Sequence, residues 1–289
     1  MFNLKPHQHI IFLSCLLVLC HHQKQTMKIG IVGFGPFAQF LAKTMIKQGH
    51  SITASSRSDY SEVCKHLGIA SFYRDMAALF ESDNDAILIC TSILSLKQVV
   101  KSMPFHCLRR QTLFVDVLSV KEHPRDILLQ VLPEDSDLLC THPMFGPESG
   151  RDGWKDLAFM YDRVRIRDEA LCSSFLQIFS SEGCRMLEMT CEEHDKQAAR
   201  SQFITHTIGR ILSEMEVEST PIDTRGFQKL VQVKETTSKH SFDLFSGLFI
   251  HNRFARQQME SLELAFEKTK QKLQERLKEE QDISMINHH

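Results

Sequence analysis

The chain has no marked excess of charge of either sign, because 34 basic residues nearly balance 36 acidic ones among its 289 residues. A net charge of −2 provides no basic field for a phosphate backbone, so we expect no nucleic-acid partner. Its nine cysteines form no C-x-x-C pair and no zinc-like spacing with histidine. We therefore expect reduced cysteines in an intracellular compartment, no disulfide framework and no metal site.

The apolar run at residues 9–20 is shorter than the ~20 residues that a membrane-spanning helix needs. Lys5 precedes this run as in a secretory signal, but no small-residue cleavage site follows, and the run lacks the character of an organelle transit peptide. Met27 directly precedes the first predicted strand, so residues 1–26 could also lie upstream of the true start. We expect residues 1–26 to lie outside the fold and no membrane partner. The expected location is cytoplasmic, or a plastid if residues 1–26 belong to a targeting segment.

What the chain does contain is a predicted strand, tight turn and helix in residues 27–50. Between strand and helix stands a G-x-G-x-x-A arrangement made of Gly33, Phe34, Gly35, Pro36, Phe37 and Ala38. In such a turn Gly33 permits the bend, Gly35 lets the backbone approach a pyrophosphate, and Ala38 lets the helix pack closely on the strand. We predict a dinucleotide whose phosphates bind at the helix N-terminus; a plain glycine-rich turn is the alternative.

The second predicted strand, residues 51–56, ends without the acid that NAD-dependent enzymes place against the ribose 2′-hydroxyl. Ser56, Arg57 and Ser58 instead offer hydroxyls and a guanidinium, which suit a 2′-phosphate. The sequence therefore favours NADP as the cofactor. An exposed serine-rich turn is the alternative, and Asp59 keeps it open.

Strand-like runs alternate with helical stretches up to about residue 190, a pattern typical of a mostly parallel sheet with helices on both faces. Residues 158–160, 163–166 and 184–188 are expected as edge strands. From residue 191 the apolar spacing is helical throughout. We predict an α/β fold, a Rossmann-type doubly wound sheet in residues 27–190, followed by an all-helical substrate and dimerisation domain in residues 191–278 and a disordered tail in residues 279–289.

Reactive side chains gather after two predicted strands, with Ser119 and Lys121 on one loop and His142 and Glu148 on another. Ligands of parallel sheets bind outside the carboxyl ends of the strands, where Thr91 and Ser92 also stand, so we expect these residues near the cofactor and His142 near its nicotinamide. A neutral histidine there can accept a proton from a hydroxyl while the same carbon gives up a hydride. A structural role for this single imidazole is the alternative.

Four separated segments resemble the plant-type branch of the prephenate/arogenate dehydrogenase family: GIVGFGPFAQFLAK, DVLSVKEHP, THPMFGPESG and EEHDKQAARSQFITHTIGR. The resemblance covers residues 27–278 and implies a homodimer that decarboxylates a cyclohexadienyl substrate oxidatively on the route to tyrosine. The substrate would be prephenate, giving 4-hydroxyphenylpyruvate, or arogenate, giving tyrosine.

The same resemblance suggests roles for particular residues. It makes His142 the histidine that binds the substrate hydroxyl and Ser119 the serine that helps to orient it. Gln202 and His206, from the helical domain, are expected to close the pocket from the other side. His194 belongs to the same segment and could equally begin a helix.

Two departures from the family pattern concern substrate binding. Bacterial relatives carry an arginine that clamps the substrate carboxylate, and this chain lacks one at the matching position; the candidates to replace it are Arg225, Lys229 and Arg200. Plant-type arogenate enzymes are expected to place an acid for the substrate ammonium where this chain has His240 in its substrate site. The sequence therefore favours prephenate, with arogenate as the alternative if Asp223 or Asp243 supplies the charge.

Two other functions share this architecture. A 2-hydroxy-acid dehydrogenase would place a catalytic lysine on the first long helix of the helical domain, where Lys196 stands. His142, in its proline-bounded loop, suits the first interpretation better. A non-enzymatic NADP-binding protein would tolerate the loss of His142.

Overall fold

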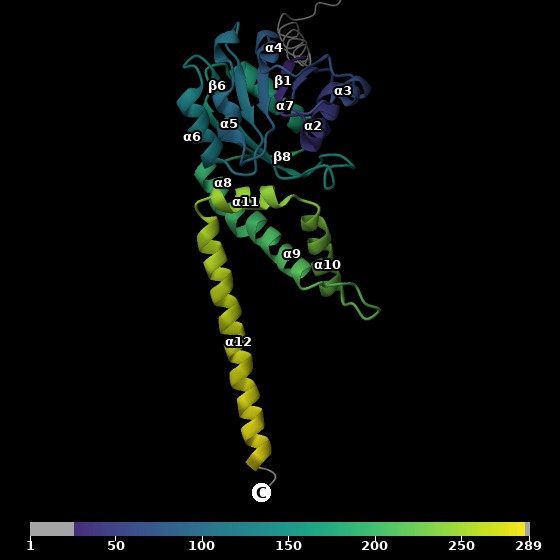
Figure 1. Ribbon diagram of the computed structural model, residues 1–289, viewed down its shortest axis with the longest axis vertical. Helices are drawn as coiled ribbons and strands as arrows, with labels where there is room; N and C mark the ends of the chain where they lie inside the picture. Colours follow the sequence, from purple (N-terminus) through teal and green to yellow (C-terminus); the bar gives the residue numbers. More distant parts are fainter. Residues whose placement is uncertain (1–25, 287–289) are drawn as a thin grey trace, which may run out of the picture.

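The computed structural model describes residues 26–286 of the chain, with side chains as far as residue 283. Nearly all of the extension that we expected outside the fold, residues 1–25, therefore lies outside the described part. The described chain has two halves, which we call the nucleotide half (residues 27–190) and the helical half (residues 191–286). Figure 1 shows the helical half below the sheet, with one long helix pointing away from the rest of the molecule.

One eight-stranded sheet forms the centre of the nucleotide half, in the order β3-β2-β1-β4-β5-β6-β7-β8. The strands are β1 (Lys28–Val32), β2 (Ser51–Ser55), β3 (Ser71–Tyr73), β4 (Ala86–Ile89), β5 (Leu113–Asp116), β6 (Asp137–Pro143), β7 (Ala158–Arg165) and β8 (Arg185–Glu188). The first six strands in this order are parallel, β7 is antiparallel to β6, and β8 is parallel to β7. The prediction of a mostly parallel Rossmann-type sheet is confirmed.

The predicted edge strands need one correction. The two predicted stretches 158–160 and 163–166 belong to a single strand, β7, which ends at Arg165. It lies inside the sheet because β8 pairs with its outer side. The chain turns back after β6, and this strand reversal is a property of the tertiary fold that the local residue pattern does not contain.

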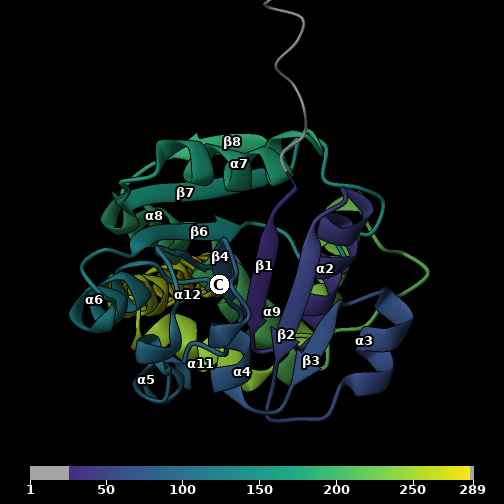
Figure 2. The ribbon, with the colours of Figure 1, turned by 90° about the horizontal axis from the view of Figure 1, so that it is seen from above.

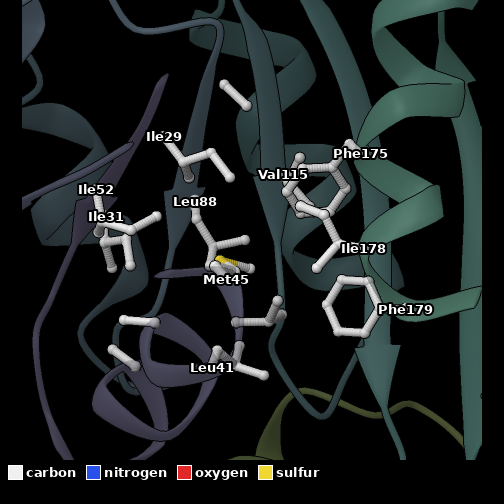
Figure 3. Close-up of a cluster of buried hydrophobic side chains, with 14 of the residues drawn as sticks. Ile29, Ile31, Leu41, Met45, Ile52, Leu88, Val115, Phe175, Ile178 and Phe179 are labelled. Carbon is white, nitrogen blue, oxygen red and sulfur yellow. The ribbon is translucent and has the colours of Figure 1, made fainter. Parts of the chain in front are cut away.

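Helices cover both faces of this sheet, as Figure 2 shows for α2 on one side and α4, α5 and α6 on the other. They are α2 (Pro36–Lys47), α3 (Ser61–Leu67), α4 (Met76–Glu81), α5 (Leu96–Lys101), α6 (Glu122–Val131) and α7 (Glu169–Ser180), with a 3-10 turn at Phe105–Cys107. Successive strand residues face opposite sides, so two apolar layers form. Figure 3 shows the layer in which α2 and α7 pack on the strands through Leu41, Met45, Phe175 and Phe179.

The helical half contains α8 (Cys191–Ala198), a π-helical segment (Ala199–Phe203), α9 (Ile204–Glu214), α10 (Arg225–Ser238), α11 (Phe242–Ile250) and α12 (Ala255–Ile286). The first three follow one another without a break, and α10 returns beside α9 (Figure 1). α12 does not end at residue 278, where we expected a disordered tail to begin, and residues 279–286 are helical. Arg276 pairs with Glu279 at 2.9 Å and with Glu280 at 3.3 Å, one turn further on, which favours continuation of the helix.

Two further observations concern the part of the chain that the structure describes. Its seven cysteines are all free thiols, five of them buried. Within residues 26–286, no helix has the combination of length and apolar character that crossing a membrane requires.

Gly209 sets the distance between α9 and α10. A Cβ atom at this position would lie 2.0 Å from Thr237 Oγ1 and 2.9 Å from Thr237 Cβ, so the two helices would have to separate. We expect Gly209→Ala to lower the free energy of unfolding by about 1–3 kcal/mol and to lower the melting temperature. Gly226→Ala in α10 is the control, because the atom closest to its new Cβ is 3.8 Å away. Equal melting temperatures for the two variants would contradict this account of the helix pair.

Candidate active site

The glycine turn lies between β1 and α2 in a form that a pyrophosphate fits. Gly33 has a φ of +87°, and a Cβ there would lie 2.6 Å from the carbonyl oxygen of Cys90, so only glycine suits this position. Gly35 precedes α2, and no atom lies within 4 Å of where its Cβ would be. No side chain caps α2, and its hydrogen bonding begins at Gln39 N, which donates to Gly35 O at 3.0 Å. The backbone N–H groups before this bond are therefore left for an anion.

The four other residues of the predicted cofactor motif differ in their surroundings. Pro36 is the first residue of α2. Phe37 is half-buried, and Ala38 is buried against the strand, as the motif requires. Phe34 is fully buried and packs edge-on against Tyr60, so it can offer a ligand only its backbone.

The turn after β2 carries the predicted 2′-phosphate residues. Arg57 and Ser58 are exposed, and Ser56 is half-buried. Asp59, which kept the alternative open, accepts hydrogen bonds from Ser61 N at 2.9 Å and Ser61 Oγ at 2.6 Å at the start of α3. These bonds, followed by the charge of Arg74, lower the pKa of Asp59.

Arg74 is a candidate that our sequence analysis missed. Ser55 in β2 pairs with Tyr73 in β3, so Arg74 emerges at the same sheet edge as Ser56. The available signal was a basic residue directly after the aromatic pair Phe72 and Tyr73. A guanidinium on each side of the turn would suit a doubly charged phosphate.

Thr91 and Ser92 follow β4 but are not equivalent. Thr91 Oγ1 is buried and has no hydrogen-bond partner among the described residues. Ser92 Oγ lies 2.7 Å from Ser95 Oγ and accepts the Ser95 N–H at 3.2 Å, at the start of α5. Thr91 is therefore the one left free for a ligand, whereas Ser92 takes part in a local turn.

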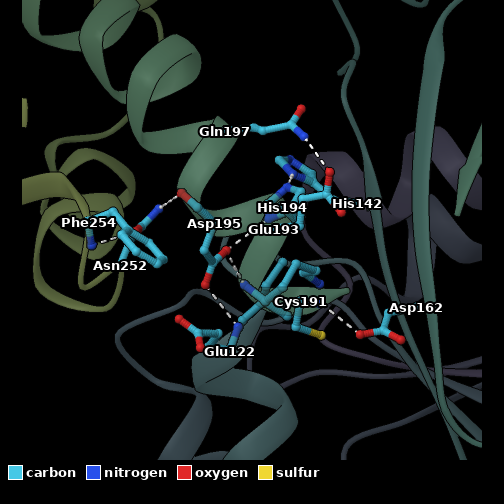
Figure 4. Close-up of polar contacts among 12 residues, drawn as sticks. Glu122, His142, Asp162, Cys191, Glu193, His194, Asp195, Gln197, Asn252 and Phe254 are labelled. Atoms are coloured by element: carbon cyan, nitrogen blue, oxygen red, sulfur yellow. Dashed lines mark hydrogen bonds and ion pairs between the residues drawn. The ribbon is translucent and has the colours of Figure 1, made fainter. Parts of the chain in front are cut away.

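His142 ends the run of polar positions along this edge. It stands at the carboxyl end of β6, three strands from the glycine turn, a lateral separation of about 14 Å. The side chain is only 3% exposed, and its Nδ1 lies 2.8 Å from His194 Nε2 (Figure 4). Burial, followed by His194 and Lys121, holds the pKa of His142 well below its usual range. The imidazole is therefore neutral near pH 7.

His194 continues into a buried carboxylate. Its Nδ1 lies 2.8 Å from Asp195 Oδ1, which also accepts the Lys121 N–H at 2.8 Å. Asp195 Oδ2 accepts the Glu122 N–H at 2.9 Å. His194 does not cap its helix, because Thr190 does so by accepting the Glu193 N–H.

Ser119 and Lys121 follow β5, the strand beside β6. Ser119 is half-buried, and its hydroxyl makes no hydrogen bond with another described residue. Lys121 is fully buried; its Nζ donates to Asp116 Oδ1 and, at 2.5 Å, to the carbonyl oxygen of Thr141 next to His142. Lys121 thus supports the strand that carries His142.

A second polar cluster lies in the helical half. Gln202, His206 and Arg210 are four residues apart and share one face of the π segment and α9. Each has a buried polar atom without a partner among the described residues: Gln202 Oε1, His206 Nδ1 and Arg210 Nε. Because orphaned buried polar atoms are rare in proteins, this row indicates a ligand surface.

His240 joins this cluster by stacking on His206, with ring centroids 5.0 Å apart. Burial, followed by His240 and Arg210, lowers the pKa of His206 to about 4. Arg210 Nη2 donates to the carbonyl oxygens of His240 at 2.9 Å and Ser241 at 3.1 Å, so it also holds the link between α10 and α11. Arg210 was not predicted, although its helical spacing from Gln202 and His206 was a usable signal.

The basic residues that we expected to replace the missing arginine lie elsewhere. Arg225 and Lys229 are exposed in the first turns of the 14-residue helix α10, whereas His240 follows its last turn. At 1.5 Å per residue, Arg225 is about 21 Å from that end. Arg200 is exposed as well. Within one chain, the cation beside His206 and His240 is Arg210.

The helical half contacts loops at the carboxyl edge of the sheet in two places. A Cβ at Gly247 of α11 would lie 2.9 Å from Ile93, just after Thr91 and Ser92, so α11 sits directly on that loop. Glu148, from the loop after β6, pairs with Lys239 at 3.2 Å. Glu148 is also close enough to raise the pKa of His240, which burial and Arg210 lower overall.

Comparison with known proteins adds two family models and close relatives. Residues 41–164 match the model of the prephenate dehydrogenase nucleotide-binding domain, and residues 211–285 match that of the TYRAAT1-like C-terminal domain. The chain is 56% identical over 255 residues to arogenate dehydrogenase 1, chloroplastic, of Arabidopsis thaliana, covering 87% of this chain and 40% of that protein. It is 51% identical over 261 residues to arogenate dehydrogenase 2, chloroplastic, of the same plant, covering 89% and 73%.

Solved structures share the fold at low sequence identity. Prephenate dehydrogenase from Aquifex aeolicus, in complex with hydroxyphenyl propionate and NAD+, gives a TM-score of 0.70 at 17% identity, covering 89% of this chain and 93% of that one. Arogenate dehydrogenase from Synechocystis gives 0.60 at 18% identity, covering 84% and 90%.

The open space above Gly35 can be tested directly. We expect Gly35→Val to abolish measurable binding of NADPH in a fluorescence titration, because its side chain would fill the space that a pyrophosphate needs. The melting temperature should not fall, since no atom of the protein lies within 4 Å of the new Cβ. Gly226→Ala, at the far end of the helical half, is the matched control. Unchanged affinity in Gly35→Val would show that the cofactor does not bind at this turn.

Proposed function

The chain belongs to the prephenate/arogenate dehydrogenase family, and we propose that it catalyses the NADP-dependent oxidative decarboxylation of arogenate to tyrosine. The chain spans 40% of the length of arogenate dehydrogenase 1 and 73% of that of arogenate dehydrogenase 2. The activity of those whole proteins is therefore a proposal for this chain. One observation carries the proposal. An open dinucleotide turn and a buried neutral histidine, His142, lie along the same edge of one parallel sheet.

The site contains side chains for the proton transfer and for substrate binding that this reaction requires. A bound NADP would supply the acceptor for the hydride of the ring carbon that bears the substrate hydroxyl. His142 accepts the proton of that hydroxyl, and Ser119, on the neighbouring loop, orients it. The ring carboxylate leaves as carbon dioxide, and the ring becomes aromatic. Arg210 is the cation available for a substrate carboxylate, with Gln202 and His206 beside it.

The comparisons support arogenate better than prephenate, contrary to the preference that the sequence suggested. That preference depended on His240 standing where an acid was expected. Glu148 reaches the same place from the nucleotide half, so a carboxylate is available for the substrate ammonium. Asp223 does not serve, because it bonds Thr220 before α10, at the end of that helix away from His240.

NADP is the finer part of the cofactor proposal. The matched nucleotide-binding domain implies a nicotinamide dinucleotide of either kind. Arg57 and Arg74 beside Ser56 favour the phosphorylated form, and Asp59 is engaged by Ser61 instead of being free for a ribose hydroxyl.

We also infer a homodimer formed through α12. This 32-residue helix points away from the body of the chain (Figure 1), and it leaves Leu264, Phe266, Leu273 and Leu277 more than half exposed. Phe266, Leu273 and Leu277 recur at helical spacing and form one stripe. A second copy of the helical half would cover it.

The alternative 2-hydroxy-acid activity and the expected cytoplasmic location are both less well supported. Lys196, the lysine that a 2-hydroxy-acid dehydrogenase would use, is exposed on α8, whereas His194 and Asp195 beside it are buried. The cytoplasmic location has no support, because both Arabidopsis relatives are named chloroplastic. We infer a plastid location.

The decisive assay offers arogenate and prephenate in turn to the purified chain, each with NADP and with NAD. We expect the highest kcat/KM with arogenate and NADP. His142→Ala should lower kcat on the order of 10²-fold or more while NADPH affinity stays unchanged, because only the proton acceptor is lost. Absence of NADPH formation with either substrate would end the proposal, and full activity of His142→Ala would remove His142 from the mechanism.

Glu148 should decide the substrate ratio. We expect Glu148→Gln to lower kcat/KM for arogenate about tenfold relative to prephenate, which corresponds to about 1.4 kcal/mol. Lys239→Met is the control, since it breaks the same ion pair but leaves the carboxylate in place. An equal loss with both substrates would mean that Glu148 does not read the ammonium group.

A further inference from the structure

The starting observation is a chain of three side chains that ends at His142. Asp195, His194 and His142 are linked by two contacts of 2.8 Å each, and all three are buried (Figure 4). Only His142 has a role in the function proposed above. His194 and Asp195, neighbours in α8, come from the helical half, whereas His142 comes from the nucleotide half.

The carboxylate sets the direction of the first hydrogen bond. Asp195 faces the backbone N–H groups of Lys121 and Glu122 in addition to His194 Nδ1. Donors alone surround it, an arrangement that suits the ionised form, which can only accept. A neutral His194 must therefore carry its proton on Nδ1 and donate it to Asp195. Its Nε2 is then a lone-pair acceptor.

The second contact follows from the first. His142 Nδ1 lies 2.8 Å from His194 Nε2, and two lone pairs cannot share such a contact. His142 must donate from Nδ1, which leaves the lone pair on its Nε2. This atom has no hydrogen-bond partner among residues 26–283. It is the acceptor that a substrate hydroxyl requires.

We propose that His194 and Asp195 are positioning residues that hold His142 in the Nδ1–H tautomer and take over the positive charge formed during the reaction. The inference deepens the proposed function and rests on it. The hydroxyl proton of the substrate goes to His142 Nε2, and the Nδ1 proton of His142 passes to His194 Nε2. The O–H bonding pair becomes the second bond of a carbonyl as the hydride leaves the same carbon. The imidazolium is then His194, in contact with the Asp195 carboxylate.

Charge placement favours this transfer. His142 is next to Thr141, whose carbonyl oxygen accepts a hydrogen bond from the buried Lys121 ammonium, so a second positive charge on His142 would be poorly placed. His194 has a carboxylate at 2.8 Å instead. The reacting histidine can thus pass on the proton that it receives without staying charged.

The tautomer can be read without substrate. We would label the full chain with 15N-histidine and record two-bond 15N–1H correlation spectra, with His142 assigned from its absence in His142→Asn. We expect His142 and His194 to show the Nδ1–H pattern. A His142 signal with the proton on Nε2, or a charged His194 in the resting protein, would overturn the proposal.

Variants separate positioning from folding. His194→Gln can still accept the His142 proton through its amide oxygen, so it should keep the tautomer of His142 but lose the charge relay. His194→Leu should lose both and move His142 to the Nε2–H form. We expect kcat to fall on the order of 10²-fold or more in His194→Leu. The kcat of His194→Gln should be about tenfold higher than that of His194→Leu, and NADPH affinity should be unchanged in both.

The control is His66→Gln in α3, which removes an exposed histidine of the nucleotide half. It should change neither the His142 signal nor kcat. Equal kcat for His194→Leu and the unaltered chain would refute the relay even if the reaction is as proposed. The tautomer result, in turn, stands whether or not arogenate is the substrate, so the two failures can be told apart.

Discussion

The buried carboxylate of Asp195 is the contact on which the arrangement of the two halves depends. Its oxygens accept the N–H groups of Lys121 and Glu122 at the start of α6, where a negative charge is favoured by the helix dipole. Its backbone carbonyl oxygen accepts a hydrogen bond from Asn252 Nδ2 at 2.8 Å, just before α12. One residue of α8 thus joins the nucleotide half, the pair His142 and His194, and the start of α12. Loss of any of these donors would leave a buried charge partly unsatisfied.

Contacts on both sides of Asp195 set the position of the continuous helix formed by α8, the π segment and α9. Cys191 N donates to Asp162 Oδ2 in β7 at 2.7 Å, so the helix starts against the sheet. In the π segment that follows, Phe203 stacks on Phe245 and Phe249 of α11. The result is that one continuous helix presents His194 to His142 at one end and the row from Gln202 to Arg210 further along. The packing of the two halves therefore also sets the positions of the candidate site residues.

Local pattern was enough to predict the sheet, the glycine turn and the helical second half. Gly33 and Gly35 show why, since the backbone angle of one and the open space above the other are requirements of a few consecutive residues. Asp195 was missed for the opposite reason, because the N–H groups that it accepts belong to residues 74 and 73 positions away. Arg210 was missed although its helical spacing from Gln202 and His206 was a local signal. Arg225 and Lys229 were chosen by their place in the family pattern, but the length of α10 separates them from His240. The position of β7 was misjudged because its antiparallel direction and its pairing with β8 depend on the tertiary fold and not on the local sequence.

The orphaned polar atoms have an energetic meaning of their own. A buried donor or acceptor that is left without any partner costs about 1–3 kcal/mol, and the buried atoms of Gln202, His206 and Arg210 have no partner among the described residues. Alternative apolar residues on that helix face would remove the cost. The arrangement makes sense if a substrate supplies the missing partners, since each bond it forms then satisfies one of these buried atoms. Affinity and orientation would come from the same three atoms, and a ligand that leaves one of them unpaired would bind correspondingly worse.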